Sequence, residues 1–188
     1  PDSPEFKMME QDIENRAKDK AQRKKKGEEF KVRGNEAMAE GKFMKAFKLY
    51  TEGLHEDKSS CSLLTNRALA CLRLKGREVT LEKLGEDVTL GSYQQAVDDC
   101  TKVLDVCEFL HENKGPGVRA LRVKAHLRKA AALRAKGQPT QAREECERAL
   151  ANVEDLPRED RKELETLKAK YEADEQEEER LKRLRVLA

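Results

Sequence analysis

The hydrophobic pattern from Phe30 to Leu54 predicts two antiparallel helices joined by a tight turn. In the first helix, the small residues Gly34 and Ala37 allow a second helix to approach closely, and Gly41 is placed to end it. The second helix carries a wide apolar stripe at helical spacing, formed by Phe43, Ala46, Phe47, Tyr50 and Leu54. A lone helical hairpin cannot bury this stripe, so the pattern predicts further helices packed against it.

The same order of small and apolar residues occurs twice more, which indicates internal repeats. The second copy contains Ala68, Cys71, Tyr93, Ala96, Cys100, Val103 and Leu104. The third contains Ala130, Gly137, Pro139, Ala142, Cys146, Ala149 and Leu150. The spacing between copies exceeds a period of about 34 residues by about 16 and then about 12. We assign the excess to insertions near 76–91 and 111–117.

These copies resemble the helix-turn-helix unit of the tetratricopeptide-repeat family, over roughly residues 28–155. The resemblance implies an all-α fold: a right-handed superhelical solenoid of three repeats. In this family the first helix of each pair lines a concave groove that binds peptides. We expect the repeats to occupy 30–156, after a charged helical extension at 7–29. Residues 1–6 read as vector-derived.

The segment 157–188 predicts a long capping helix. Pro157 starts it, acidic residues fill its first turn and basic residues lie near its end, as the helix dipole favours. Leu164, Leu167 and Tyr171 lie at helical spacing and give its first half one apolar face. Beyond Tyr171 we expect a projecting charged helix.

Composition is consistent with a thin helical solenoid, because 40% of residues are charged and only 4% are aromatic. The net charge of +2 does not indicate nucleic-acid binding, and the basic cluster 23–26 has acidic neighbours and no interleaved aromatic residue. No apolar run approaches the 18 or so residues of a membrane span, and no signal peptide is evident. We expect a cytoplasmic chain without nucleic-acid or membrane partners.

Polar residues on the first helices of the repeats are the candidate chemistry. Lys31 and Asn35 are four residues apart, as are Lys124 and Arg128, and Asn66 opens the helix between them. Singly, each is typical of a surface charge or a local cap. Together, in the segments KVRGN, TNRA and KAHLRKAAAL, they resemble the five-residue carboxylate clamp of co-chaperone tetratricopeptide domains. That clamp binds the C-terminal Glu-Glu-Val-Asp tail of cytosolic heat-shock chaperones of the ninety- and seventy-kilodalton classes.

The residue types suit this ligand, because a C-terminal Asp presents two carboxylates that lose hydration on binding. Lys31 and Lys124 offer positive charge, while Asn35 and Asn66 offer amide donors. Arg128 can bind a carboxylate or a carbonyl further along the tail.

Three apolar residues beside the clamp, Met38, Leu69 and Leu127, are candidate contacts for the peptide side chains. Packing between helices explains them equally well. The insertion 77–91 could cover one end of the groove or carry a second partner, but we expect a mobile loop.

Two constellations were weighed for other chemistry. Cys100, Cys107 and His111 lie on one helical face and could hold zinc with a fourth ligand, but the same face carries Val103, which favours core packing. The chain has five cysteines without CxxC spacing, and we expect reduced, mostly buried thiols. His126 has no catalytic partner placed by sequence, so we expect a helix-packing or groove-edge residue. No metal or cofactor is expected.

The sequence therefore predicts a non-catalytic co-chaperone adaptor. Two alternatives stay open. The long insertions favour a scaffold in a multiprotein assembly, and the run ALRVKAHLRKAAAL looks similar to the C-terminal tetratricopeptide domain of a dynein axonemal assembly factor, which acts in dynein preassembly. The chain could also be the targeting domain of a larger enzyme whose catalytic domain lies elsewhere.

Overall fold

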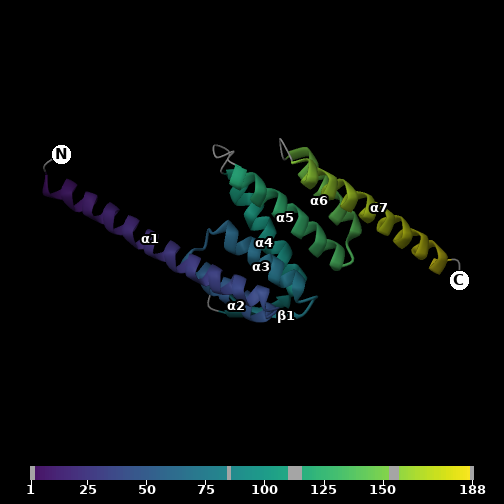
Figure 1. Cartoon of the computed structure of the whole chain (residues 1–188), viewed down its shortest axis with the longest axis horizontal. Coiled ribbons are helices and arrows are strands. Elements are labelled where there is room, and N and C mark those ends of the chain that lie inside the picture. Colours follow the sequence, from purple (N-terminus) through teal and green to yellow (C-terminus); the bar gives the residue numbers. More distant parts are fainter. Residues whose placement is uncertain (1–2, 84–85, 110–115, 153–156, 187–188) are drawn as a thin grey trace.

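The computed structural model describes residues 3–83, 86–109, 116–152 and 157–186, which form seven α-helices and one β-hairpin (Figure 1). In chain order the elements are α1 (Pro4–Ala39), α2 (Phe43–Glu56), α3 (Cys61–Arg73), β1 (Glu78–Lys83), β2 (Glu86–Gly91), α4 (Ser92–Phe109), α5 (Pro116–Ala135), α6 (Pro139–Asn152) and α7 (Arg158–Val186). Each helix packs on the next, so that α1–α2, α3–α4 and α5–α6 are three stacked hairpins with α7 against α6 (Figure 1). The predicted all-α solenoid of three repeats and a capping helix is confirmed.

The turns inside the first and third hairpins share one chemical solution. Gly41 and Gly137 both have positive φ, at 73° and 77°, a conformation in which a Cβ would be strained. The reversal lets the Lys42 N–H donate to the Ala37 carbonyl at 2.9 Å, which satisfies an otherwise free carbonyl at the end of α1. Gly41 therefore ends the first helix as predicted.

The close approach of α1 and α2 depends on Gly34. A Cβ at this position would lie 2.4 Å from Cε1 of Tyr50, far inside van der Waals contact. The Tyr50 ring crosses the backbone of α1 there and is 1% exposed. The prediction of a small residue at a helix contact is thus confirmed, with Tyr50 as the contacting side chain.

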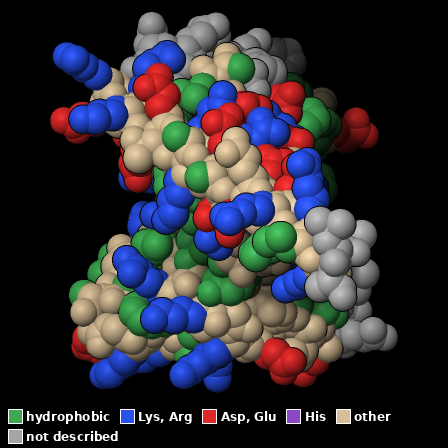
Figure 2. Space-filling model, turned by 90° about the vertical axis from the view of Figure 1, so that its right-hand side faces the viewer, with side chains coloured by type: hydrophobic (Ala, Val, Ile, Leu, Met, Phe, Trp, Pro, Cys, Tyr) green, Lys and Arg blue, Asp and Glu red, His purple; other side chains and the backbone are tan. Residues whose placement is uncertain are grey.

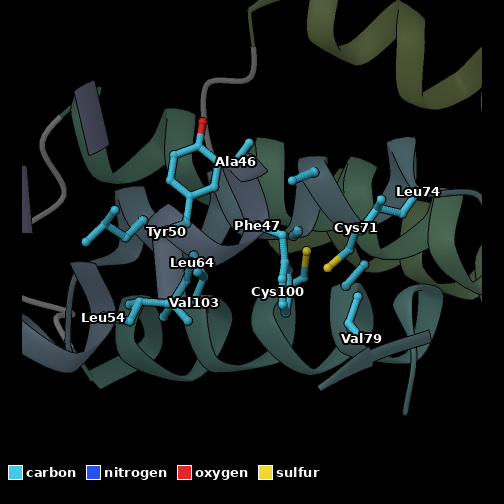
Figure 3. Close-up of a cluster of buried hydrophobic side chains, with 14 of the residues drawn as sticks. Ala46, Phe47, Tyr50, Leu54, Leu64, Cys71, Leu74, Val79, Cys100 and Val103 are labelled. Carbon is cyan, nitrogen blue, oxygen red and sulfur yellow. The ribbon is translucent and has the colours of Figure 1, made fainter. Parts of the chain in front are cut away.

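The hydrophobic core consists of two clusters. The first is built by α1–α4 and the hairpin, with α5 adding alanines, and Figure 3 shows part of it around Phe47, Tyr50 and Val103. The second joins α5, α6 and α7 and comprises Val123, Ala130, Leu133, Ala142, Cys146, Ala149, Leu164 and Tyr171. Val97 packs against both clusters. The apolar face predicted for the capping helix is therefore buried against the third repeat.

The insertion at 77–91 is not the mobile loop that we expected. β1 and β2 pair antiparallel, with Val79 opposite Leu90 and Leu81 opposite Val88. Val79 and Leu81 are buried in the first cluster. The segment alternates apolar and polar residues on both sides of a turn, which is the period of a half-buried strand. That alternation was visible in the sequence, and it gives the hairpin a face to bury.

The first part of α1 extends away from the stack (Figure 1). All its described residues before Gly27 are exposed, including Met8, Met9 and Ile13. Most of the second expected insertion, 111–117, lies outside the described residues. None of the described helices has the length and apolar character required to cross a membrane.

Candidate functional site

Three neighbouring helices carry the five candidate residues. Lys31 and Asn35 lie on α1, Asn66 on α3, and Lys124 and Arg128 on α5. Helix α3 contacts both α1 and α5, so the first helices of the three hairpins adjoin in order. On the face in Figure 2 the molecule is hollowed near its middle, with hydrophobic side chains in the hollow and Lys and Arg side chains around it.

A shared acceptor joins α1 to α3. The Asn66 Nδ2 donates to the Asn35 Oδ1 at 3.0 Å, and the Tyr50 hydroxyl donates to the same oxygen at 2.8 Å. Because both bonds use the oxygen, the amide nitrogen of Asn35 is left to donate to a ligand. Burial raises the pKa of Tyr50 to about 12, against the opposing charge of Arg128, so the hydroxyl stays a donor at neutral pH.

Sequence reasoning placed Tyr50 only in the apolar stripe. A tyrosine where the stripe could use phenylalanine is the signal that a buried hydroxyl needs a partner.

A second hydrogen bond joins α5 to α3. The Arg128 Nη1 donates to the backbone carbonyl of Thr65, the residue before Asn66. Burial lowers the pKa of Arg128, but a guanidinium keeps its charge at neutral pH. Asn35, Asn66 and Arg128 are therefore tied to one another through α3.

The two lysines are not part of this chain of hydrogen bonds. The Lys31 ammonium pairs with Glu28 one turn earlier in α1, and 22% of its side chain is exposed. Lys124 is exposed, and its side chain forms no hydrogen bond or ion pair with the other described residues. One cation therefore already has a carboxylate partner, while the other is open.

The three apolar candidates differ in their packing. All are half-buried, but Met38 packs against the first cluster and Leu127 against the second. Among the described residues, Leu69 belongs to neither cluster.

A buried ion pair holds α3 on α4 directly after Asn66. The Nε and Nη2 atoms of Arg67 donate to the two carboxylate oxygens of Asp99 at 2.8 and 2.7 Å. Gln95 donates to the same carboxylate at 2.7 Å, and Arg67 also reaches Thr51 on α2. This network positions Asn66, and sequence reasoning missed it.

A second buried carboxylate, Glu145 of α6, holds α5. The Nδ1 of His126 lies 2.8 Å from its Oε1, and Lys129 and Arg148 approach its Oε2 at 3.3 and 3.0 Å. Burial acts to raise the pKa of Glu145, but the bond to His126 and the charge of Lys129 outweigh it and lower this pKa. His126 is a helix-packing residue, and its carboxylate partner was not visible in the sequence.

The cysteines lie mostly in the core. Cys71, Cys100, Cys107 and Cys146 are buried and Cys61 is half-buried, all as free thiols. His111, the third member of the zinc constellation, lies outside the described residues. Within the described ranges, no group of three or more His, Cys, Asp or Glu residues is arranged to hold a metal ion.

Three stacked helical hairpins with a capping helix are the fold of a tetratricopeptide-repeat domain. No protein-family model matches the chain. Human "Tetratricopeptide repeat protein 12" is 40% identical over 73 residues, which is 39% of this chain. The match spans only 10% of that protein's length.

Solved structures show the same architecture. The chain is similar to the "First TPR of Spaghetti (RPAP3) bound to HSP90 peptide SRMEEVD", with 26% identity and a TM-score of 0.54, covering 77% of this chain and 91% of that one. It also shares the fold of the second TPR domain of human RPAP3, solved with the HSP70 peptide SGPTIEEVD, at 23% identity and a TM-score of 0.52. That match covers 79% of this chain and 98% of the other. These names do not support the narrower likeness to a dynein assembly factor.

Proposed function

We propose that the chain is a non-catalytic adaptor that binds the C-terminal tail of a heat-shock chaperone ending in Glu-Glu-Val-Asp. The observation that carries the proposal is the hydrogen-bonded set of Asn35, Asn66 and Arg128 across α1, α3 and α5, with Lys31 and Lys124 on the same helices. A domain of similar fold, 26% identical, was solved with the HSP90 peptide SRMEEVD, which supports this ligand class.

The chemistry of the set matches a peptide terminus. The α-carboxylate and the Asp side chain need donors to offset the hydration that they lose. Lys124 is open to provide an ion pair, and the amide nitrogen of Asn35 remains a donor because its oxygen is already used. Lys31 exchanges Glu28 for a peptide carboxylate, so no buried charge is left unpaired during binding.

Arg128 has a different part in the proposal. One of its nitrogens is committed to the Thr65 carbonyl, which fixes the guanidinium, and the others can bind a residue before the terminus. The tails of both the ninety- and the seventy-kilodalton chaperones offer this chemistry. Partners of this kind would place the chain in the cytoplasm.

Binding of a fluorescent peptide ending in Met-Glu-Glu-Val-Asp tests the proposal. We expect a Kd of micromolar order, a free energy of about 8 kcal/mol. A peptide with an amidated C-terminus loses one of the two carboxylates and should bind roughly tenfold more weakly or worse.

Two variants locate the site. Lys124→Ala removes the open ammonium and should weaken binding roughly tenfold or more. Lys48→Ala, on the outer helix α2, removes an equally exposed lysine outside the set and should bind as the parent does. Binding that ignores amidation, or that responds equally to both variants, would refute the clamp and favour the scaffold alternative.

A further inference from the structure

Two thiols meet at the end of the second repeat that lies opposite the β-hairpin. The hairpin joins the end of α3 to the start of α4, so the start of α3 and the end of α4 have no short connection. Cys61 is the first residue of α3, and Cys107 lies in the last turn of α4. Their sulfur atoms are in hydrogen-bond contact.

The two sulfurs differ in access. Cys107 is buried in the first cluster. Cys61 is half-buried and lines an open groove of about 1240 Å³ between α1 and the turn from α2 to α3. Most charged side chains along this groove are basic, including Lys24, Lys26 and Lys58. A small oxidant can therefore reach Cys61 but not Cys107.

The contact also activates Cys61. The hydrogen bond from the Cys107 thiol lowers the pKa of Cys61 to about 7, although burial opposes this. The same bond and burial raise the pKa of Cys107, so that this residue keeps its proton. At neutral pH a large fraction of Cys61 is thiolate, the reactive form.

We propose that Cys61 and Cys107 are a peroxide-sensitive thiol pair that closes into a disulfide and fastens the open end of the α3–α4 hairpin. The Cys61 thiolate attacks one oxygen of hydrogen peroxide, the O–O bond breaks, and a sulfenic acid and hydroxide form. The Cys107 sulfur then attacks the sulfenic sulfur. The S–S bond forms, the S–O bond breaks, and the departing hydroxide leaves with the thiol proton as water. Two electrons pass from the pair to the peroxide, and a dithiol reductant returns them.

The chain contains its own control pair. Cys71 of α3 and Cys100 of α4 are both fully buried, and Figure 3 shows their sulfur atoms close together in the first cluster. Burial raises the pKa of Cys100 to about 12 and also raises that of Cys71. This pair is near but neither accessible nor ionised, so proximity alone predicts a disulfide here and our inference predicts none.

The test treats the native protein with a few equivalents of hydrogen peroxide, alkylates the remaining thiols after unfolding and maps the peptides without reduction. We expect a Cys61–Cys107 cross-linked peptide that is about 2 Da lighter than the two thiols, and alkylated Cys71 and Cys100. In Cys107→Ala the reaction should stop at a Cys61 sulfenic acid that dimedone captures. An equal yield of Cys71–Cys100, or no cross-link while Cys61 is oxidised further, would overturn the inference.

Two further readouts separate a switch from a chance reaction. The rate of Cys61 alkylation should be half-maximal near pH 7 and should fall below that pH, and in Cys107→Ala the midpoint should move upward because the hydrogen bond is lost. Hydrogen exchange in the first turn of α3 and the last turn of α4 should slow roughly tenfold on oxidation, but not in Cys61→Ser. The inference rests on the thiols alone, so it can fail or hold whatever the peptide-binding result.

Discussion

The α1–α4 region and the α5–α7 region of the repeat stack are stabilised by different interactions. The first buries large side chains such as Phe47, Tyr50 and Leu63 and contains the enclosed Arg67–Asp99 pair. The second buries mainly alanines, with Leu164 and Tyr171 from the capping helix, and places Glu145 among three cationic side chains. Apolar burial is insensitive to pH and ionic strength near neutrality, whereas charge pairs depend on both. The two regions should therefore respond differently to acid and to salt.

The proposed peptide site extends over both regions. Lys31, Asn35 and Asn66 belong to the first, while Lys124 and Arg128 belong to α5. Helix α5 touches α3 and α4 on one side and α6 on the other. A change that loosens α5 should therefore weaken binding even when α1–α4 stays folded, and the following variants test this division.

Asp99→Ala should have the largest effect on stability. It leaves the Arg67 guanidinium buried without its bidentate partner, which costs about 3–5 kcal/mol of unfolding free energy. Urea unfolding followed by circular dichroism measures the loss. The comparison variant is Asp174→Ala in the largely exposed pair with Arg134, where we expect less than about 1 kcal/mol. Equal losses would show that the burial of the Arg67 pair has no special weight.

Glu145→Gln should destabilise the α5–α7 region by about 2–3 kcal/mol, because a charged acceptor shared by three cations is lost. The native-state pKa of Glu145 is lowered from 4.5, so its contribution is fully present above about pH 4.5 and is lost as the pH falls through the lower native value.

Thermal unfolding between pH 3 and 7 should thus show a difference between parent and variant that shrinks in acid. A difference that stays constant over this range would contradict the ionised-carboxylate account. Peptide affinity measured at neutral pH should also fall in Glu145→Gln, because α5 carries Lys124 and Arg128.

Gly34→Ala should cost about 1–3 kcal/mol, since the new methyl group overlaps the Tyr50 ring and forces α1 and α2 apart. Gly117→Ala is the matched control in the α5–α7 region. Nothing lies within 4 Å of a Cβ there, and alanine favours a helix, so this variant should be neutral or gain up to about 1 kcal/mol. Denaturation midpoints of the two variants should move in opposite directions or differ clearly in size.

Tyr50→Phe should have the smallest effect on stability, about 1 kcal/mol, because only one hydroxyl is removed. Its effect on peptide binding should be larger than that of a merely structural residue, because the Asn35 amide loses one of its two restraints. A double-mutant cycle with Asn35→Ala separates the two roles. If Tyr50 acts by orienting Asn35, the affinity losses are not additive; additive losses would assign Tyr50 to packing alone.

Local rules were enough to predict much of this molecule. The apolar stripe of α2, the small residues at the helix contact and the turn at Gly41 each follow from spacing along one or two helices. The five candidate residues could be found because their own positions in the repeats mark them. The hairpin at 77–91 was also readable, but its strand alternation was passed over in favour of the usual mobility of insertions.

The remaining features depend on pairs whose members are far apart in the chain. Tyr50 with Asn35, Arg67 with Asp99, His126 with Glu145, and Cys61 with Cys107 are 15, 32, 19 and 46 residues apart. Spacing along the chain shows which face of a helix a residue occupies. It does not show which residue of the neighbouring helix lies opposite, because a shift of one turn between packed helices exchanges every partner. The sequence by itself therefore determined the repeats and their faces, whereas the packing of the helices decided which polar groups meet.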